Sequence, residues 1–157
     1  MFEDLLQLLL FILPAYFANS APVLFGGGAP MDFKAKAWDG RRVFGDGKTW
    51  RGFLAGIIAG TIVGALLNAY LLGVLLSLGT MLGDLFGSFL KRRLGLERGH
   101  PGFAIDQLPF LLFALAFASP IYLPSWEGIL VLIILTYVLH VSTNFLANRL
   151  GLKKVPW

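Results

Sequence analysis

The stretch from Gly83 to Gln107 reads GDLFGSFLKRRLGLERGHPGFAIDQ and interrupts a chain that is otherwise mostly apolar. It carries a carboxylate, Asp84, then a group of cations, then a second carboxylate, Asp106. A carboxylate within a membrane helix is costly, and it usually faces a cavity, an ion path or a partner. The stretch therefore predicts a polar site held between apolar helices.

The composition indicates the class of protein. Of the 157 residues, 57% are hydrophobic and 14% are charged, and the mean hydropathy is +0.74, which is more apolar than a soluble domain of this size. We therefore predict a membrane protein. The absence of cysteine excludes disulfides and thiolate metal sites. The net charge of +4 would suit nucleic acid, but the cations flank membrane-length apolar runs, so we expect no nucleic-acid partner.

Five apolar segments set the expected fold. They cover residues 5–25, 53–72, 74–90, 108–123 and 128–148, each near the roughly 20 residues that cross a bilayer core. Asn68, Tyr70 and Gly73 indicate a tight hairpin between the second and third segments. We predict an all-α, polytopic integral membrane protein with five transmembrane helices in a single domain, residues 1–157. Its cytoplasmic loops are expected at residues 26–52 and 91–107.

The charges indicate how the chain is oriented. Six cations lie between the first and second segments, four between the third and fourth, and three after the fifth, which accounts for all 13. With five crossings, all of them fall on one side of the membrane. The positive-inside rule then predicts an outside N-terminus and a cytoplasmic C-terminus in the cell membrane. Alternatively, the basic loops only orient the chain and contact anionic headgroups.

Two stripes run along the third predicted helix. The polar stripe consists of Thr80, Asp84, Ser88 and Lys91. The small-residue stripe consists of Gly79, Gly83 and Gly87, and it allows another helix to approach closely. The pattern predicts a polar cleft that opens to the cytoplasm. The alternative is a structural ion pair between Asp84 and Lys91 or Arg92.

Asp106 lies where the fourth apolar segment begins. Alone, it could complement the positive end of a helix dipole. With Asp84, it supplies a second hard oxygen ligand beside several cations, and this combination suits a divalent cation that bridges phosphates. We therefore predict Asp84 and Asp106 as ligands of Mg²⁺. Ion or proton translocation would also need the carboxylates, but it has less use for the cations.

The first basic loop contains GDGKTWRG, residues 45–52. It is not a Walker A motif, because Arg42 stands where that motif needs a glycine and no βαβ pattern surrounds it. A glycine-flanked turn before a helix still attracts anions, so we expect phosphate binding. The candidate residues are Lys48, Thr49 and Arg51. The alternative is a headgroup anchor with Trp50 at the membrane interface.

Two further patterns are interpreted as mainly structural. Glycines recur at intervals of four in the second segment, at Gly52, Gly56, Gly60 and Gly64. This stripe is typical of close helix packing, either within the chain or in a homo-oligomer. His140, Asn144 and Asn148 form a polar stripe on the fifth segment, which favours interhelix hydrogen bonds over catalysis. His100 could contact a phosphate or remain solvated.

Three motifs resemble a known family. GDGKTWRG, GDLFGSFLKRRLGLERGHPGFAIDQLPF and the closing LGLKKVPW are similar to the archaeal CDP-archaeol synthases, relatives of the bacterial and eukaryotic phosphatidate cytidylyltransferases. The resemblance extends over nearly the whole chain, and the long second motif is specific. The broader signature has a serine, a Lys-Arg pair, a His-Gly-Gly loop and an Asp-Arg pair. The matching residues here are Ser88, Lys91, Arg92, His100, Pro101, Gly102, Asp106 and Gln107.

Pro101 and Gln107 depart from the bacterial pattern and favour the archaeal branch. The resemblance implies that Asp84 and Asp106 bind metal and act in catalysis with Lys91. It places Lys48, Arg51, Lys91 and Arg92 near the nucleotide phosphates, and the full set of candidate phosphate-binding residues is Lys48, Thr49, Arg51, Ser88, Lys91, Arg92 and His100.

The implied reaction is cytidylyl transfer in phospholipid biosynthesis. CTP and a phosphorylated glycerol ether lipid, 2,3-bis-O-geranylgeranylglycerol 1-phosphate, would give CDP-archaeol and pyrophosphate. The lipid phosphate is already an anion and needs no general base, so catalysis reduces to alignment and charge stabilisation. Two alternatives remain: a CTP-dependent polyprenol kinase, which would release CDP, and a small transporter, which should show internal repeats that we do not find in the spans.

Overall fold

The computed structural model describes residues 4–96 and 102–151. Within these ranges the chain forms five helices and no strand, which confirms the predicted all-helical class. The helices are α1 (Leu5–Phe25), α2 (Trp50–Leu66), α3 (Tyr70–Arg93), α4 (Phe103–Ala118) and α5 (Trp126–Arg149). The long loop between α1 and α2 contributes only isolated bridges, one of which joins Lys36 to Arg42.

Three of these helices are long and apolar enough to cross a membrane. They are α1, α3 and α5, with 21, 24 and 24 residues. The apolar helices α2 and α4 are shorter, with 17 and 16 residues. The protein is therefore a membrane protein, and a crossing by all five helices stays a prediction.

Several helix ends differ from the predicted spans. The turn between α2 and α3 lies at residues 67–69, where Asn68 has a left-handed backbone (φ 56°), so Tyr70 and Gly73 already belong to α3. The predicted boundary at residues 72–74 was therefore wrong. α3 continues to Arg93 and α4 begins at Phe103, so both predicted loop limits, 91 and 107, lie inside helices. Hydropathy marks the apolar part of a helix, whereas the backbone hydrogen bonds continue through its polar ends.

The glycine stripes bring the helices into close contact within this chain. A Cβ added at Gly79 or Gly83 would come closer than 3.0 Å to the backbone of α4 at Phe113 or Pro109. A Cβ at Gly60 would likewise meet the backbone carbonyl of Pro14 in α1. Both predicted packing stripes are thus buried against neighbouring helices of the same chain.

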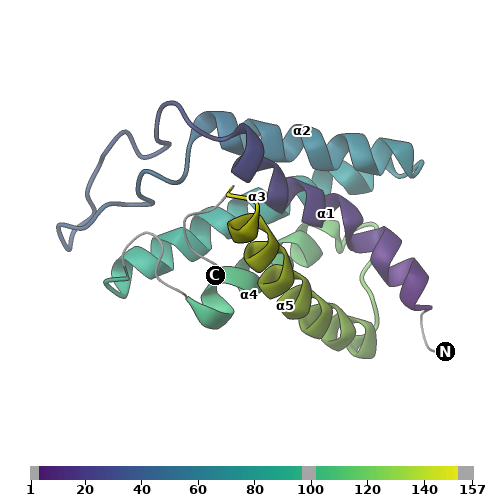
Figure 1. The fold of residues 1–157 in the computed structure, drawn as a ribbon. Helices are drawn as coiled ribbons and strands as arrows, with labels where there is room; N and C mark the ends of the chain where they lie inside the picture. Colours follow the sequence, from purple (N-terminus) through teal and green to yellow (C-terminus); the bar gives the residue numbers. More distant parts are fainter. Residues whose placement is uncertain (1–3, 97–101, 152–157) are drawn as a thin grey trace.

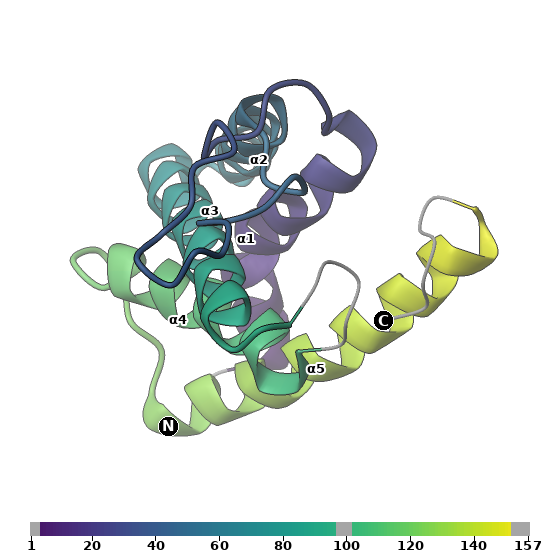
Figure 2. The ribbon, with the colours of Figure 1, turned by 90° about the vertical axis from the view of Figure 1, so that its left-hand side faces the viewer.

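α5 differs from the other helices in its packing. Figure 2 shows α1–α4 side by side, while α5 crosses them and its C-terminal half projects away. Its buried residues are Gly128, Leu132 and Thr136, all in the first half. The Thr136 hydroxyl shares a 2.9 Å hydrogen bond with the Tyr16 hydroxyl of α1, which links α5 to the core.

The polar segments gather at one end of the molecule. Figure 1 shows the α1–α2 loop, the last turn of α3 and the start of α4 at the same end. The N-terminus and the α4–α5 connection lie at the opposite end. This arrangement brings the two basic motifs of the sequence to one place.

Candidate active site

The first carboxylate, Asp84, is paired with a lysine from the α1–α2 loop. The Lys48 Nζ donates to Asp84 Oδ1 at 2.7 Å and to Oδ2 at 2.6 Å. Both side chains are about one-quarter exposed, at 26% and 24%. They line a small hollow together with Pro22, Met81 and Leu85.

The local structure explains how Lys48 reaches this position. Thr49 is the N-cap of α2, and its hydroxyl accepts a hydrogen bond from the N–H of Gly52 at 3.2 Å. Serine and threonine are preferred at this position because they satisfy a free N–H of the first turn. Lys48 therefore directly precedes a capped helix start, near amides that favour anions. The Thr49 hydroxyl serves the cap, and its contact with phosphate stays a prediction.

The second carboxylate, Asp106, is paired with a lysine from α3. The Lys91 Nζ donates to Asp106 Oδ1 at 2.8 Å, and the backbone N–H of Gly102 donates to Oδ2 at 2.9 Å. Asp106 lies in the first turn of α4, where a negative charge is favoured. This pair therefore joins the end of α3 to the start of α4.

The two pairs are connected through α3. Asp84 and Lys91 are seven residues apart on this helix, which corresponds to about 10 Å along its axis. They lie on the polar stripe predicted from the sequence, so one face of α3 contributes to both pairs. Ser88, between them on the same stripe, is partly buried.

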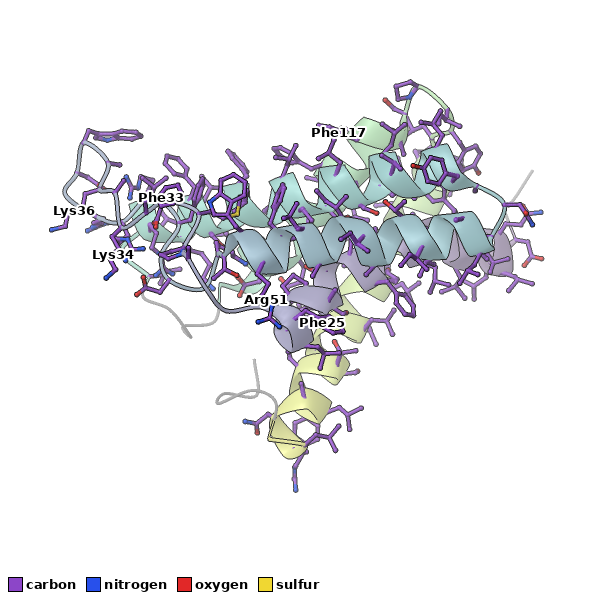
Figure 3. All side chains as sticks on the ribbon, turned by 90° about the horizontal axis from the view of Figure 1, so that it is seen from above. Phe25, Phe33, Lys34, Lys36, Arg51 and Phe117 are labelled. Atoms are coloured by element: carbon purple, nitrogen blue, oxygen red, sulfur yellow. The ribbon has the colours of Figure 1, made fainter. Side chains whose placement is uncertain are left out.

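The remaining candidates lie in different places. Arg51 is exposed on the first turn of α2 (Figure 3). Arg92 comes close to the loop, because its Nη1 would lie 3.6 Å from a Cβ at Gly45. His100 lies outside the described residues, and so does Pro101.

A buried aspartate in the loop was not predicted from the sequence. The Asp32 side chain is 1% exposed, and it accepts hydrogen bonds from the Arg42 guanidinium and from three backbone N–H groups, those of Lys34, Phe44 and Gly45. Burial by itself raises the pKa of this carboxyl, but the hydrogen bonds outweigh it and hold the pKa well below its usual range. The loop contains three aspartates, Asp32, Asp39 and Asp46, so nothing in the sequence singled out Asp32.

A second contact holds the same loop against α3. The Arg93 guanidinium forms a 2.9 Å ion pair with Asp39 and donates to the carbonyl of Arg42 at 2.6 Å. The rings of Trp38 and Phe89 lie 5.4 and 5.0 Å from this guanidinium. Arg93 therefore attaches the loop to the end of α3, in the same region as Lys91.

Each of the two carboxylates is the kind of donor that magnesium uses when it is bound together with phosphate groups. Among residues 4–96 and 102–151 there is no cluster of three or more metal-ligating side chains. Magnesium is commonly held by one or two carboxylates plus substrate phosphates and water, rather than by an all-protein cage. The partly exposed carboxylates of Asp84 and Asp106 offer that kind of donor.

The whole chain, residues 1–157, matches the family model described as CarS-like, CDP-archaeol synthase. The chain belongs to the CDP-archaeol synthase family. A CDP-archaeol synthase of Pyrococcus horikoshii is 51% identical over 99% of this chain and 98% of its own length. The CDP-archaeol synthase of Archaeoglobus fulgidus is 42% identical over the full length of both chains.

A solved structure supports the fold of this CDP-archaeol synthase family member. It is described as an intramembrane enzyme for archaeal membrane lipids biosynthesis and is 38% identical. The TM-score is 0.85, and the match covers 90% of this chain and 94% of the other. The resemblance stated from the sequence motifs is therefore confirmed at the level of family and fold.

Proposed function

We propose that this protein transfers the cytidylyl group of CTP to a phosphorylated archaeal glycerol ether lipid, 2,3-bis-O-geranylgeranylglycerol 1-phosphate. The products are CDP-archaeol and pyrophosphate. Family membership supports the reaction class. The observation that carries the proposal is the pairing of two partly exposed carboxylates with two lysines at one end of an apolar helix bundle.

The reaction explains the kinds of residues in the site. An oxygen of the lipid phosphate attacks the α-phosphorus of CTP, and the bond between that phosphorus and the bridging oxygen to the β-phosphate breaks. The attacking oxygen is already anionic, so neither a general base nor a protein nucleophile is required. What the protein must supply is alignment of two polyanions and compensation of their charge.

Each residue then has a defined role. Asp84 and Asp106 would hold Mg²⁺, which supplies Lewis-acid stabilisation of phosphate oxygens when bound. Lys48 and Lys91 hold the two carboxylates in place, and their ammonium groups donate to phosphate oxygens of the nucleotide. Further phosphate contacts are assigned to Thr49, Arg51, Ser88, Arg92 and His100.

The membrane provides the second half of the site. The apolar helices keep the lipid tails in the bilayer, while the loop and helix ends that carry the cations face the cytoplasm and receive CTP. This places the N-terminus outside and the C-terminus inside the cell. Cysteine-accessibility labelling of residues introduced in the α1–α2 loop would test the orientation, and protection of that loop from the cytoplasmic side would contradict it.

The reaction is tested with protein purified in detergent. It is supplied with CTP labelled on the α- or the γ-phosphate, Mg²⁺ and the phosphorylated lipid. We expect the α-label in the lipid and the γ-label in pyrophosphate. In a parallel reaction supplied with a polyprenol, release of CDP with the γ-label in polyprenyl phosphate would identify a kinase, and the absence of any transfer in both reactions would favour a transporter. The Asp84→Asn variant, prepared in the same way, controls for contaminating activities.

A further inference from the structure

We infer that Asp32 is a positioning residue of the site: its buried carboxylate sets the backbone of the α1–α2 loop so that the Lys48 ammonium is held on Asp84. The inference rests on the proposed function, because that function assigns Lys48 a contact with the phosphates of the nucleotide. It adds a residue that lies outside both basic motifs.

Asp32 joins two separate parts of the loop. It accepts a hydrogen bond from the backbone N–H of Lys34 at 3.1 Å. Its other bonds come from residues 42–45: Arg42 Nε at 3.2 Å, Arg42 Nη2 at 2.6 Å, Phe44 N at 3.0 Å and Gly45 N at 2.9 Å. A buried carboxylate with this many donors is firmly held, since every acceptor position is used.

Two backbone hydrogen bonds connect Lys48 to residues beside this carboxylate. The N–H of Lys48 donates to the carbonyl of Gly45 at 3.2 Å, and the carbonyl of Lys48 accepts from the N–H of Met31 at 2.7 Å. The N–H of Gly45 donates directly to the Asp32 carboxylate, and Met31 directly precedes Asp32 in the chain. The N–H of Lys48 is thus tied to a residue that the Asp32 carboxylate binds, and its carbonyl is tied to the residue that precedes Asp32 in the chain.

A fixed backbone matters at Lys48 because the lysine side chain is long and flexible. Lysine places its charge on a flexible four-carbon stem, so its ammonium has no preferred location unless the main chain is held. Here the ammonium makes two short contacts with Asp84, a residue 36 positions away in the sequence. Gly45 also has φ +91°, a left-handed backbone that the turn before Lys48 requires.

The alternative is that Asp32 only stabilises the loop. A double-mutant cycle separates the two roles, because a residue that acts through Lys48 loses its effect once Lys48 is replaced. The variants are Asp32→Asn, Lys48→Gln and their combination. Asp39→Asn is the matched control: it removes the same charge from the same loop, where Asp39 pairs with Arg93.

The readouts are CTP affinity in the presence of Mg²⁺, kcat for pyrophosphate release, and the thermal midpoint of each variant. We expect Asp32→Asn to weaken CTP binding by about tenfold, as for the loss of one charge-assisted hydrogen bond. In the Lys48→Gln background the same change should add less than about twofold. The Asp39→Asn change should have the same effect on CTP affinity with or without Lys48.

Several outcomes would overturn the inference. They are additive losses for Asp32→Asn and Lys48→Gln, unchanged CTP affinity in Asp32→Asn, or unchanged affinity in Lys48→Gln. Pyrophosphate release by the wild-type protein is measured in the same preparation, so its absence defeats the proposed function separately. If Asp32→Asn does not fold, Asp32→Glu, which keeps the charge but moves the carboxylate by one methylene, replaces it in the cycle, and additivity there overturns the inference equally.

Discussion

The two lysine–aspartate pairs differ in how the chain holds them. Lys91 and Asp106 are 15 residues apart on adjoining helix ends, and Asp106 is also bound by the nearby N–H of Gly102. Asp84 receives both of its described hydrogen bonds from Lys48, which lies in an irregular loop 36 residues away. The Lys91–Asp106 pair therefore joins two adjoining helix ends, whereas the Lys48–Asp84 pair depends on the fold of a distant loop.

The Lys48–Asp84 pair is not explained by stability alone. A partly exposed ion pair typically contributes about 0.2–1 kcal/mol. A carboxylate placed centrally in a membrane helix costs about 2.5–3.5 kcal/mol on insertion scales, more than the pair returns. Asp84 lies within α3, several residues before its cationic end. Such a cost is typical of a functional site, which is consistent with the proposed metal and nucleotide binding.

The largest effect is expected when the carboxylate of either lysine–aspartate pair is removed. We expect Asp84→Asn and Asp106→Asn to fold and to lower turnover by at least about a hundredfold, because each loses a proposed metal ligand. Pyrophosphate release at saturating CTP measures the effect. Full activity in either variant would defeat the metal assignment, and thermal unfolding confirms that the protein remains folded.

Replacing the lysines should have a smaller effect and should distinguish the pairs. Lys48→Gln and Lys91→Gln are each expected to weaken CTP binding by about 10- to 100-fold, as for hydrogen bonds to charged groups. Asp106 keeps its contact with Gly102 when Lys91 is lost, so the turnover of bound CTP should fall less in Lys91→Gln than in Lys48→Gln. Equilibrium CTP binding and single-turnover rates provide the two measurements. Wild-type affinity in both variants would contradict their role.

A further difference should appear in metal binding without nucleotide. The ammonium groups of Lys48 and Lys91 compete with a cation for the carboxylates that they contact. We expect Lys48→Gln to bind Mn²⁺ more tightly than the wild type when CTP is absent, by a few-fold, since one competing charge is removed. Paramagnetic resonance of free Mn²⁺ measures this affinity. Asp84→Asn serves as the control that should bind less, and equal affinities in all three proteins would contradict the expected competition.

The smallest effect is expected outside both pairs. His140 lies in the C-terminal half of α5, beyond Thr136, the last buried residue of this helix. His140→Ala should retain a measurable fraction of activity, within about twofold of the wild type, as is usual for substitutions away from a site. The same pyrophosphate assay applies. A loss comparable with that of Asp84→Asn would show that the site extends to α5.

The sequence predicted the features that depend on residues close together in the chain. The five helices and both glycine stripes were predicted, because hydropathy and the helical period act over a few residues. The helix ends were less accurate: Arg93 and Asp106 lie inside helices because polar residues continue the backbone hydrogen bonding. Asp32 was missed because its five donors come from residues whose positions depend on the loop conformation.

By itself, the sequence determined a helical membrane protein of the CDP-archaeol synthase family with Asp84 and Lys91 on one face of a helix. Only the tertiary structure decided that Lys48 is the partner of Asp84, that Arg93 attaches the loop to α3, and that α5 stands partly apart. The physical reason is distance along the chain. Which residues share a helix face follows from a fixed rotation per residue, whereas the partner of a charge 36 residues away depends on how the whole loop closes.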